Sequence, residues 1–442
     1  MPVIESVPSD SDFPKKTTIA IIGGGIIGVS TALELAERGI SVVVLEKGIV
    51  AGEQSSRNWG WCRQMGRDPR EIPLVLESLQ LWRGMNKRVG AETGYRQCGI
   101  IYLAETEVEL AAKEKWYTEN ARAFGLDTRL VSGAEAERLQ PGSTRRWKGA
   151  LYTSADGRAE PFLAVPAMAR QAQKLGVKIF QNCAVRGVET TAGKVSSVAT
   201  EKGPIACEQV VLAGGAWSRR FLHNLGIAFP QLTVVNSVMR TAALDTGVEK
   251  SCSGGKFAFR KRIDGGYTIA HRLTSVADIL PDSFRLFLQF LPALKQDWSG
   301  LRLRLGKRFI DEVRLKRRWE LDERSPFEEV RILDPEPVHS ILDEAAASLR
   351  DYYPSFQSMQ IAERWAGVID ATPDVVPVIS ALPKVDGLYL ASGFSGHGFG
   401  LGPGAGKLMA QMIVGDQTCV DPTPFRYLRF FDGSKMRPTT GL

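Results

Sequence analysis

Residues 17–46 read TTIAIIGGGIIGVSTALELAERGISVVVLE, and this stretch decides the fold of the N-terminal part of the chain. The run at 17–22 is short, apolar and β-branched, as expected of a buried parallel strand. Gly23, Gly25 and Gly28 follow it with the spacing GxGxxG, and a helical pattern and a second apolar strand come next. A strand, a glycine-rich turn, a helix and a strand in this order predict a βαβ unit that binds a dinucleotide.

The residue types of this stretch suit a pyrophosphate and a ribose. Gly23 permits a tight turn, Gly25 lets the backbone approach the pyrophosphate, and Gly28 lets the helix pack closely on the sheet. The N-terminus of the helix offers free N–H groups and the positive end of its dipole. Glu46 ends the second strand, where it can accept hydrogen bonds from both ribose hydroxyls and opposes a 2′-phosphate. FAD or NAD is therefore favoured over NADP, and a glycine turn without a ligand is the alternative.

Features far along the chain favour FAD over NAD. Residues 51–64 (AGEQSSRNWGWCRQ) form a small, polar loop that can run past the pyrophosphate, and residues 209–218 (QVVLAGGAWS) form a strand that ends on small residues. Residues 387–411 form a strand, a glycine-rich loop and a helix, a second cradle of amides that can stabilise the reduced flavin ring. The expected cofactor-binding residues are Gly23, Gly25, Ile26, Ile27, Gly28, Glu46, Lys47, Gln54, Ser55, Ser56, Arg57, Asn58, Ala184, Val185, Ala213, Gly214, Gly393, Phe394, Gly396, His397, Gly398, Phe399 and Gly400.

Composition excludes several other classes of protein. The 442 residues are 44% apolar and 24% charged, which is ordinary for a globular enzyme, and the net charge of +7 comes without a nucleic-acid-binding motif. Six scattered cysteines and four histidines give no disulfide framework and no metal site. No signal peptide and no membrane span is evident, so a soluble, cytoplasmic protein is expected. The basic stretch 302–318 is interpreted as a solvated helix face, with a membrane or partner surface as the alternative.

The sequence resembles the D-amino-acid-oxidase superfamily of flavoenzymes, and within it the bacterial L-amino acid deaminases and soluble L-amino acid oxidases. The similar stretches are AERGISVVVLEKGIVAGEQSSR (36–57), KIFQNCAVRGVETTAGKVSSVATEKGPI (178–205), WELDERSPFE (319–328) and PFRYLRF (424–430). The resemblance implies non-covalent FAD and oxidation of an L-amino acid to an imine, which water converts to a 2-oxo acid and ammonia. The polar start of the chain departs from the membrane-anchored deaminases and favours reoxidation by O2, with hydrogen peroxide as product.

The resemblance also implies the domain organisation. We expect an α/β fold in which a discontinuous, Rossmann-like FAD-binding domain is joined by a second α+β domain that carries a mixed sheet. The FAD-binding domain is assigned to 17–75, 155–230 and 357–430, the substrate-binding domain to 76–154 and 231–356, and a flexible N-terminal segment to 1–16. Residues 256–273 are expected to form a hairpin with an Asp-Gly-Gly turn. A homodimer is possible.

An amino-acid substrate needs a fixed donor for its α-carboxylate, and arginine supplies one in two-pronged form. The hairpin offers Arg260, Arg262 and Arg272, of which Arg272 resembles the carboxylate-binding arginine of the deaminases; an exposed arginine at a strand end is the alternative. Glycine oxidases place an arginine shortly after the WAG motif, whereas this sequence has Val368 and Asp370 in that region.

Other residues near the expected flavin have open roles. Asp370 is expected either beside the substrate ammonium or bonded to backbone in a turn. Trp365, Phe394 and Trp61 are candidate apolar walls of the substrate site, and His397 is expected to orient its loop or to act in acid–base chemistry. Hydride transfer to the flavin needs no dedicated acid or base when the amine is neutral, so no catalytic side chain is assigned.

Two other functions remain open from the sequence. One is a dehydrogenase of the same fold that oxidises D-amino acids or N-methyl amines and passes electrons to a quinone. The other is a flavin-containing binding protein without turnover. Fold alone does not decide among these, because one fold carries many functions.

Overall fold

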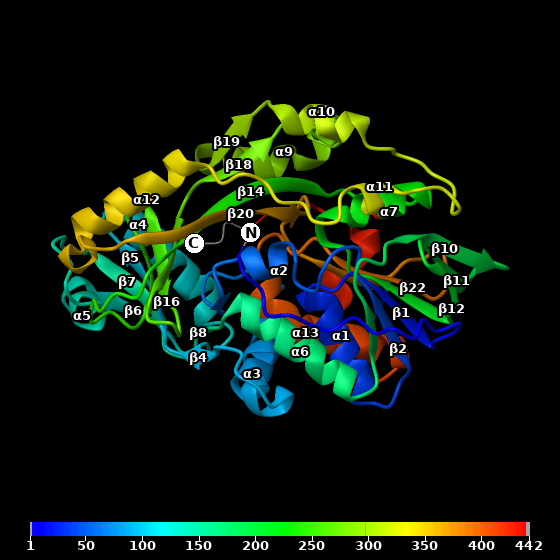
Figure 1. Cartoon of the computed structure of the whole chain (residues 1–442). Helices are drawn as coiled ribbons and strands as arrows, with labels where there is room; N and C mark the ends of the chain where they lie inside the picture. The colour runs from blue at the N-terminus through cyan, green and yellow to red at the C-terminus, as the bar shows by residue number, and fades with distance from the viewer. Residues whose placement is uncertain (1, 297, 439–442) are drawn as a thin grey trace.

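Two large β-sheets organise the computed structural model, which describes residues 2–296 and 298–438 (Figure 1). The first has six strands in the order β21-β22-β13-β1-β2-β9, and all neighbours are parallel except β21 and β22. Its strands are β1 (Ile19–Ile22), β2 (Val42–Leu45), β9 (Lys178–Phe180), β13 (Gln209–Leu212), β21 (Val378–Ala381) and β22 (Leu388–Ser392). The sheet therefore joins three distant parts of the chain, and the expected α/β fold is confirmed.

Helices cover the first sheet because its strands are apolar on both faces. Helix α1 (Ile26–Ala36) follows β1 directly, and every one of its residues is buried. It packs between α6 (Pro161–Lys174) and α13 (Gly398–Val414), and α3 (Ile72–Val89) packs against α13 in turn. After α1 the chain turns at Gly39, whose φ of 74° is the left-handed conformation that glycine adopts without strain.

The glycine-rich stretch near the C-terminus is partly helical, which differs from the loop expected there. Helix α13 begins at Gly398, and its glycines make room for neighbouring helices. A Cβ on Gly402 would lie 2.7 Å from Cγ1 of Ile26, and one on Gly404 would lie 2.8 Å from the carbonyl oxygen of Leu74. Close packing of α1, α3 and α13 therefore accounts for these glycines, which leaves the turn before Gly398 and the first residues of α13 to face a ligand.

The second sheet is mixed, as expected, and has ten strands. Its order is β19-β18-β14-β17-β16-β15-β5-β7-β6, and β20 (Ile361–Ala371) pairs with β14 (Leu232–Thr241) beside that path. The other strands are β5 (Ile100–Ala104), β6 (Thr128–Ser132), β7 (Gly149–Thr153), β15 (Ser251–Gly254), β16 (Phe257–Lys261), β17 (Tyr267–His271), β18 (Ser275–Asp278) and β19 (Leu301–Arg304). Strands β16 and β17 form the hairpin that the sequence predicts.

Smaller elements complete the fold. Above β14 in Figure 1 lies a module of α8 (Pro281–Arg285), α9 (Phe287–Gln296), β19 and α10 (Lys307–Arg314). Helix α12 (His339–Tyr352) covers the second sheet. The remaining helices are α2 (Gln54–Arg57), α4 (Glu107–Trp116), α5 (Gly133–Leu139), α7 (Ser218–Asn224) and α11 (Pro326–Glu329). One small sheet contains β3 (Trp61–Cys62), β4 (Arg96–Gln97) and β8 (Gly157–Arg158). Another contains β10 (Val185–Thr191), β11 (Lys194–Thr200) and β12 (Gly203–Ala206).

Three parts of the chain differ from what the expected domain assignment implies. The domain boundaries themselves stay a prediction. Strand β20 belongs by its hydrogen bonds to the second sheet, although the sequence assigns 357–430 to the FAD-binding domain. Most of α3 falls in the expected substrate-binding domain, yet it packs in the core of the first sheet. The N-terminal segment, expected to be flexible, is held by hydrogen bonds from the Glu5 N–H to the Phe162 carbonyl and from the Asp10 N–H to the Ile179 carbonyl.

Among the described residues, no helix combines the length and apolar character needed to cross a lipid bilayer.

Candidate functional site

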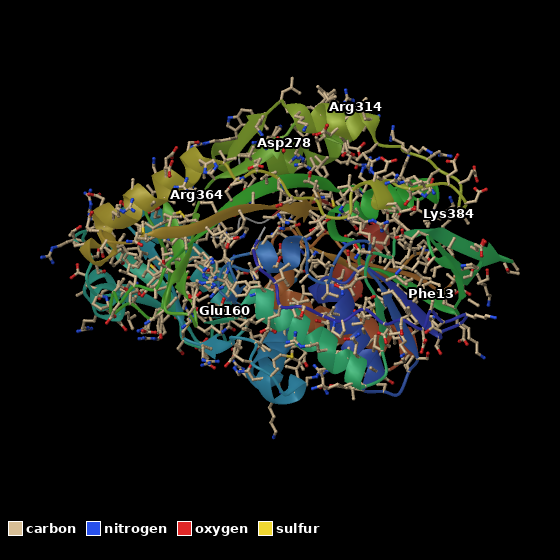
Figure 2. All side chains as sticks on the ribbon, viewed as in Figure 1. Phe13, Glu160, Asp278, Arg314, Arg364 and Lys384 are labelled. Atoms are coloured by element: carbon tan, nitrogen blue, oxygen red, sulfur yellow. The ribbon has the colours of Figure 1, made fainter. Side chains whose placement is uncertain are left out.

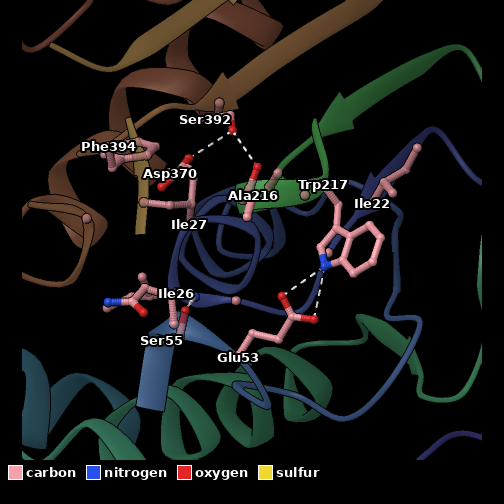
Figure 3. Close-up of a pocket in the computed structure, with 18 of the residues that line it drawn as sticks. Ile22, Ile26, Ile27, Glu53, Ser55, Ala216, Trp217, Asp370, Ser392 and Phe394 are labelled. Carbon is pink, nitrogen blue, oxygen red and sulfur yellow. Dashed lines mark hydrogen bonds between the residues drawn. The ribbon is translucent and has the colours of Figure 1, made fainter. Parts of the chain in front are cut away.

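A pocket lies where four strands of the first sheet end (Figure 3). The last residues of β1, β2, β13 and β22 all line it, and in an open α/β sheet this edge is where ligands bind. Of the expected cofactor residues, those that line the pocket are Gly23, Gly25, Ile26, Ile27, Glu46, Lys47, Gln54, Ser55, Asn58, Val185, Ala213, Gly214, Phe394, Gly396, Gly398 and Phe399. The pocket therefore gathers side chains from both ends of the chain and from its middle.

The glycine turn forms the floor of the pocket. Gly23 has a φ of +112°, and a Cβ on it would overlap the carbonyl oxygen of Ala213. A Cβ on Gly25 would lie 2.9 Å from Oγ of Ser55, and that hydroxyl oxygen accepts a 2.9 Å hydrogen bond from the Ile26 N–H (Figure 3). Only glycine leaves this space open at the N-terminus of α1, where amides and the helix dipole favour an anion.

Glu46 is fixed by two backbone amides at the end of β2. One carboxylate oxygen accepts a 2.7 Å hydrogen bond from the Gly24 N–H, and the other accepts a 2.7 Å bond from the Gly48 N–H. Burial raises the pKa of the carboxyl group, which these two hydrogen bonds and Lys47 oppose. The side chain is thus held at the pocket wall with acceptor capacity left for ribose hydroxyls.

Several residues of the pocket were not expected from the sequence, among them Trp217, Glu53, Ser392 and Phe327. Trp217 donates its indole N–H to both carboxylate oxygens of Glu53 at 3.0 Å, and Lys47 lies 4.5 Å over the Trp217 ring (Figure 3). Ser392 and Phe327 also line the pocket. Little in the sequence favoured the selection of Trp217, which is one of nine tryptophans, or of Glu53, which is one acid in a polar loop.

Some expected cofactor residues support the site from outside the pocket. Arg57 is buried and donates to the carbonyls of Gly52 and Ala366, at 3.3 and 2.9 Å. Ser56 is buried and donates to the Glu53 carbonyl at 3.3 Å. Both side chains therefore fix the loop that carries Gln54, Ser55 and Asn58.

The others outside the pocket also have internal partners. The Ala184 N–H donates to Glu201, and the Gly400 carbonyl accepts from the Ser78 hydroxyl at 2.7 Å. Gly28 packs against the glycine turn, and the Gly393 N–H donates to Asp370. Nδ1 of His397 lies 3.0 Å from Glu71, and burial lowers the pKa of this imidazole. His397 thus faces Glu71 rather than the pocket.

Asp370 lines the pocket and bonds to the protein itself. Its carboxylate accepts from the Gly393 N–H at 2.6 Å and from Nε2 of Gln231 at 3.1 Å. It also accepts from the Ser392 hydroxyl at 3.3 Å (Figure 3). Burial raises its pKa. Asp370 was expected either beside the substrate ammonium or bonded to backbone, and the structure shows the hydrogen bond to the loop backbone at Gly393.

The hairpin arginines lie outside this pocket, and each has an acidic partner. Arg260 is fully buried against Glu160, with distances of 2.7 and 2.8 Å. Arg262 bonds to Asp264 at 2.9 Å. Arg272 donates to Glu109 of α4 at 2.7 Å and to the carbonyl of Gly255, in the turn between β15 and β16, at 3.0 Å.

Among the expected aromatic walls, only Phe394 lines the pocket. Trp365 donates its indole N–H to the Arg57 carbonyl at 3.0 Å and packs with Val238 and Ala270 of the second sheet. Trp61 packs with Tyr102, and its indole N–H is buried without a hydrogen-bond partner among the described residues. Trp365, on β20, therefore lies in the second sheet and bonds to the cofactor loop, whereas Trp61 packs against Tyr102 of β5.

Arg67 is a functional candidate that the sequence analysis missed. It is only 3% exposed, and its Nη1 has no hydrogen-bond partner within the described chain. Burial, with the neighbouring Arg63, lowers the pKa of its guanidinium to about 9, and Arg67 lowers the pKa of His397. Its only signal was position, just after the polar loop 51–64. A buried donor beside the loop that contains Gly396 and Gly398 suits an anionic group.

The fold and pocket define a dinucleotide-dependent oxidoreductase, and the glycine cradle, Glu46 and the buried free Oε1 of Gln54 fit FAD. The sequence profile of the DAO family, FAD dependent oxidoreductases, matches residues 18–412, so the chain belongs to this family.

Solved and curated relatives agree with this assignment. The structure is similar to an L-amino acid deaminase from Proteus myxofaciens in complex with anthranilate, with a TM-score of 0.93 and 35% identity over 97% of this chain and 96% of that one. It is also similar to the L-amino acid deaminase from Proteus vulgaris (TM-score 0.92, 33% identity, 97% and 100% coverage). The sarcosine oxidase subunit beta of Arthrobacter is 26% identical, over 95% of this chain and 93% of that protein.

Proposed function

We propose that the protein catalyses the oxidative deamination of L-amino acids. An L-amino acid, O2 and water would give a 2-oxo acid, ammonia and hydrogen peroxide. The observation that carries this proposal is the likeness to two L-amino acid deaminases over nearly the whole chain. FAD, when bound, would supply the two-electron oxidant that accepts a hydride from the substrate Cα.

The residues of the pocket would hold FAD without a covalent bond. Glu46 would accept hydrogen bonds from the adenosine ribose, and the amides between Gly23 and Ile26 would face the pyrophosphate. Phe394 and Gly396 would lie at the flavin end, on the loop that Asp370 fixes. These residues bind and orient, so no side chain is assigned as a proton-transfer catalyst.

Two arginines are candidates to bind the substrate carboxylate. Arg272 is supported by its place in the hairpin, although it already bonds to Glu109 and Gly255. Arg67 is supported by its burial, its unpartnered Nη1 and its position near His397. A carboxylate would satisfy this donor and stabilise the charged guanidinium.

An anaerobic flavin-bleaching experiment tests the proposed function. The FAD-loaded protein is mixed with single L- and D-amino acids and with sarcosine, and absorbance near the flavin band is followed. Bleaching by L-amino acids only, followed by peroxide and 2-oxo acid formation in air, is expected. Bleaching by sarcosine or by D-amino acids, without bleaching by L-amino acids, would contradict the proposed function.

A dehydrogenase of N-methyl amines is the second candidate function, favoured by the similarity to sarcosine oxidase subunit beta. This enzyme would reduce a quinone-like dye with sarcosine as donor and consume little O2. The same screen separates the two functions, because each predicts a different reducing substrate.

A further inference from the structure

A second cavity, of about 600 Å³, adjoins the cofactor pocket and shares Ala216 and Trp217 with it. Its walls come from α7, the start of β14, α8 and α10, that is, from the module above the second sheet. Figure 2 labels Arg314, the last residue of α10, at this end of the molecule. The volume lies in the range of cavities that hold small organic molecules.

The lining of this cavity is strongly basic. Its charged residues are Arg219, Arg220, Arg285, Arg308, Arg314 and Arg317, against the acids Asp282, Asp311 and Glu312. Six cations and three anions leave a net charge of +3 on the lining. Walls of one sign focus the electrostatic field and raise the local concentration of oppositely charged ligands.

Internal ion pairs occupy the arginines on the α7 and α8 side. Asp282 accepts from Arg219 at 2.6 Å and from Arg285 at 2.8 Å. Arg220 pairs with Glu312. Asp282 and Glu312 are therefore already paired, and Arg308 pairs with Asp278, outside the lining, at 2.8 Å.

Arg314 and Arg317 remain without such partners. Both side chains are exposed, and neither guanidinium makes a hydrogen bond or an ion pair with another residue in the part of the chain that the structure describes. Burial and the neighbouring Arg285 lower the pKa of Arg317, and burial with Arg317 and Arg318 lowers the pKa of His223. The Arg317 guanidinium is thus repelled by neighbouring arginines, of which Arg285 acts most strongly, and a bound anion would relieve that repulsion.

The lining also contains apolar and aromatic residues. Trp217, Leu232, Pro281 and Leu333 line the cavity together with the basic residues. We propose that this cavity binds a small organic phosphate, whose phosphate groups lie against Arg314 and Arg317 and whose apolar body lies against Trp217. Guanidinium groups bind phosphate oxygens in two-pronged fashion, and a multiply charged anion matches a lining of +3.

The cavity is connected to the cofactor pocket through Gln231. This side chain lines the second cavity, and its Nε2 donates to Asp370 and to the Gly215 carbonyl, both at 3.1 Å. Asp370 and Gly215 line the cofactor pocket. An anion in the second cavity is therefore expected to change the absorbance spectrum of bound FAD.

Calorimetric titration of the FAD-loaded protein with inorganic pyrophosphate, at constant ionic strength, tests the proposal. One saturable site is expected for the wild type. The double variant Arg314→Glu, Arg317→Glu should weaken binding at least about tenfold, because two guanidinium contacts are replaced by repulsion. The control is Lys115→Glu with Arg146→Glu, which makes the same change of net charge at exposed positions outside the cavity.

The outcomes separate a built site from general charge attraction. Weak binding in the cavity variant and unchanged binding in the control support the site, as does a flavin spectral change that saturates with the calorimetric signal. Equal weakening in both variants, or no saturable binding to the wild type, overturns it. Because this test uses no amino-acid substrate, its result is independent of the proposed deamination.

Discussion

Arg260 and Glu160 form a two-pronged ion pair in which both side chains are buried, with N–O distances of 2.7 and 2.8 Å. Glu160 directly precedes α6 of the first sheet's core, whereas Arg260 lies on β16 of the second sheet. The pair therefore links the two sheets. The guanidinium of Arg260, one of the expected substrate contacts, is therefore already bonded to Glu160.

Glu160→Gln should lower the stability of the protein by about 3–5 kcal/mol, because it leaves the Arg260 charge buried without a counter-ion. Thermal unfolding of the FAD-loaded protein measures this as a reduced Tm. The matched control is Asp351→Asn, which breaks the exposed pair with Arg145 and should leave the Tm almost unchanged, because solvent screens an exposed pair. Equal shifts for the two variants would show that burial of the first pair has no special weight.

Gly28→Ala should impair FAD binding and stability together, because the added Cβ would overlap the carbonyl oxygen of Gly23 in the turn of the cradle. The flavin-to-protein absorbance ratio after purification and the Tm both report this. Gly84→Ala is a control of opposite sign: a Cβ there meets nothing within 4 Å, and alanine in a helix should stabilise by about 0.4–1 kcal/mol. A Gly28→Ala protein that retains full FAD content would contradict the packing argument.

Arg67→Gln should raise the KM for L-amino acids about 10- to 100-fold if Arg67 binds the substrate carboxylate, since such charged hydrogen bonds contribute about 1.5–3 kcal/mol. Arg272→Gln tests the other candidate in the same assay. The arginine whose loss leaves KM unchanged is excluded as the carboxylate contact.

The pH dependence of kcat/KM gives a second readout for Arg67. Its pKa is lowered to about 9, so the fraction of charged guanidinium falls as the pH rises through that value. The wild-type kcat/KM should therefore decline above about pH 9, and this part of the decline should be absent in Arg67→Gln. Identical profiles for the two proteins would exclude a role for its charge.

Asp156 should make the protein less stable as the pH rises from about 4 to 7. Burial raises the pKa of its carboxyl group to about 7, far above the ordinary 3.8, so in this window the folded state retains a proton that the unfolded state has lost. The maximum slope is about 1.4 kcal/mol per pH unit.

Asp156→Asn should reduce this loss of stability. The amide oxygen can still accept the 2.7 Å hydrogen bond from the Gln64 N–H, but it carries no proton to lose. The measurement is the change in Tm between pH 5 and pH 8 for both proteins. A variant that loses as much stability as the wild type would assign the pH dependence to other groups.

The sequence predicted the parts of the fold that depend on local patterns. The GxGxxG turn, α1 and the position of Glu46 follow from glycine spacing and hydrophobic periodicity over about thirty residues, and the hairpin of β16 and β17 follows from its turn residues. Of the 23 residues expected at the cofactor site, 16 line the pocket, because they cluster in loops directly after predicted strands; that they bind FAD stays a prediction.

Only the tertiary structure decided which polar groups meet. Residues 100 positions apart pair in Arg260 and Glu160, the glycines after Gly398 serve helix packing, and Arg67 is buried with an unpartnered nitrogen. No local pattern encodes these relationships. Hydrophobic periodicity fixes which face of an element is buried, whereas the partner of a buried charge depends on how distant elements pack against each other.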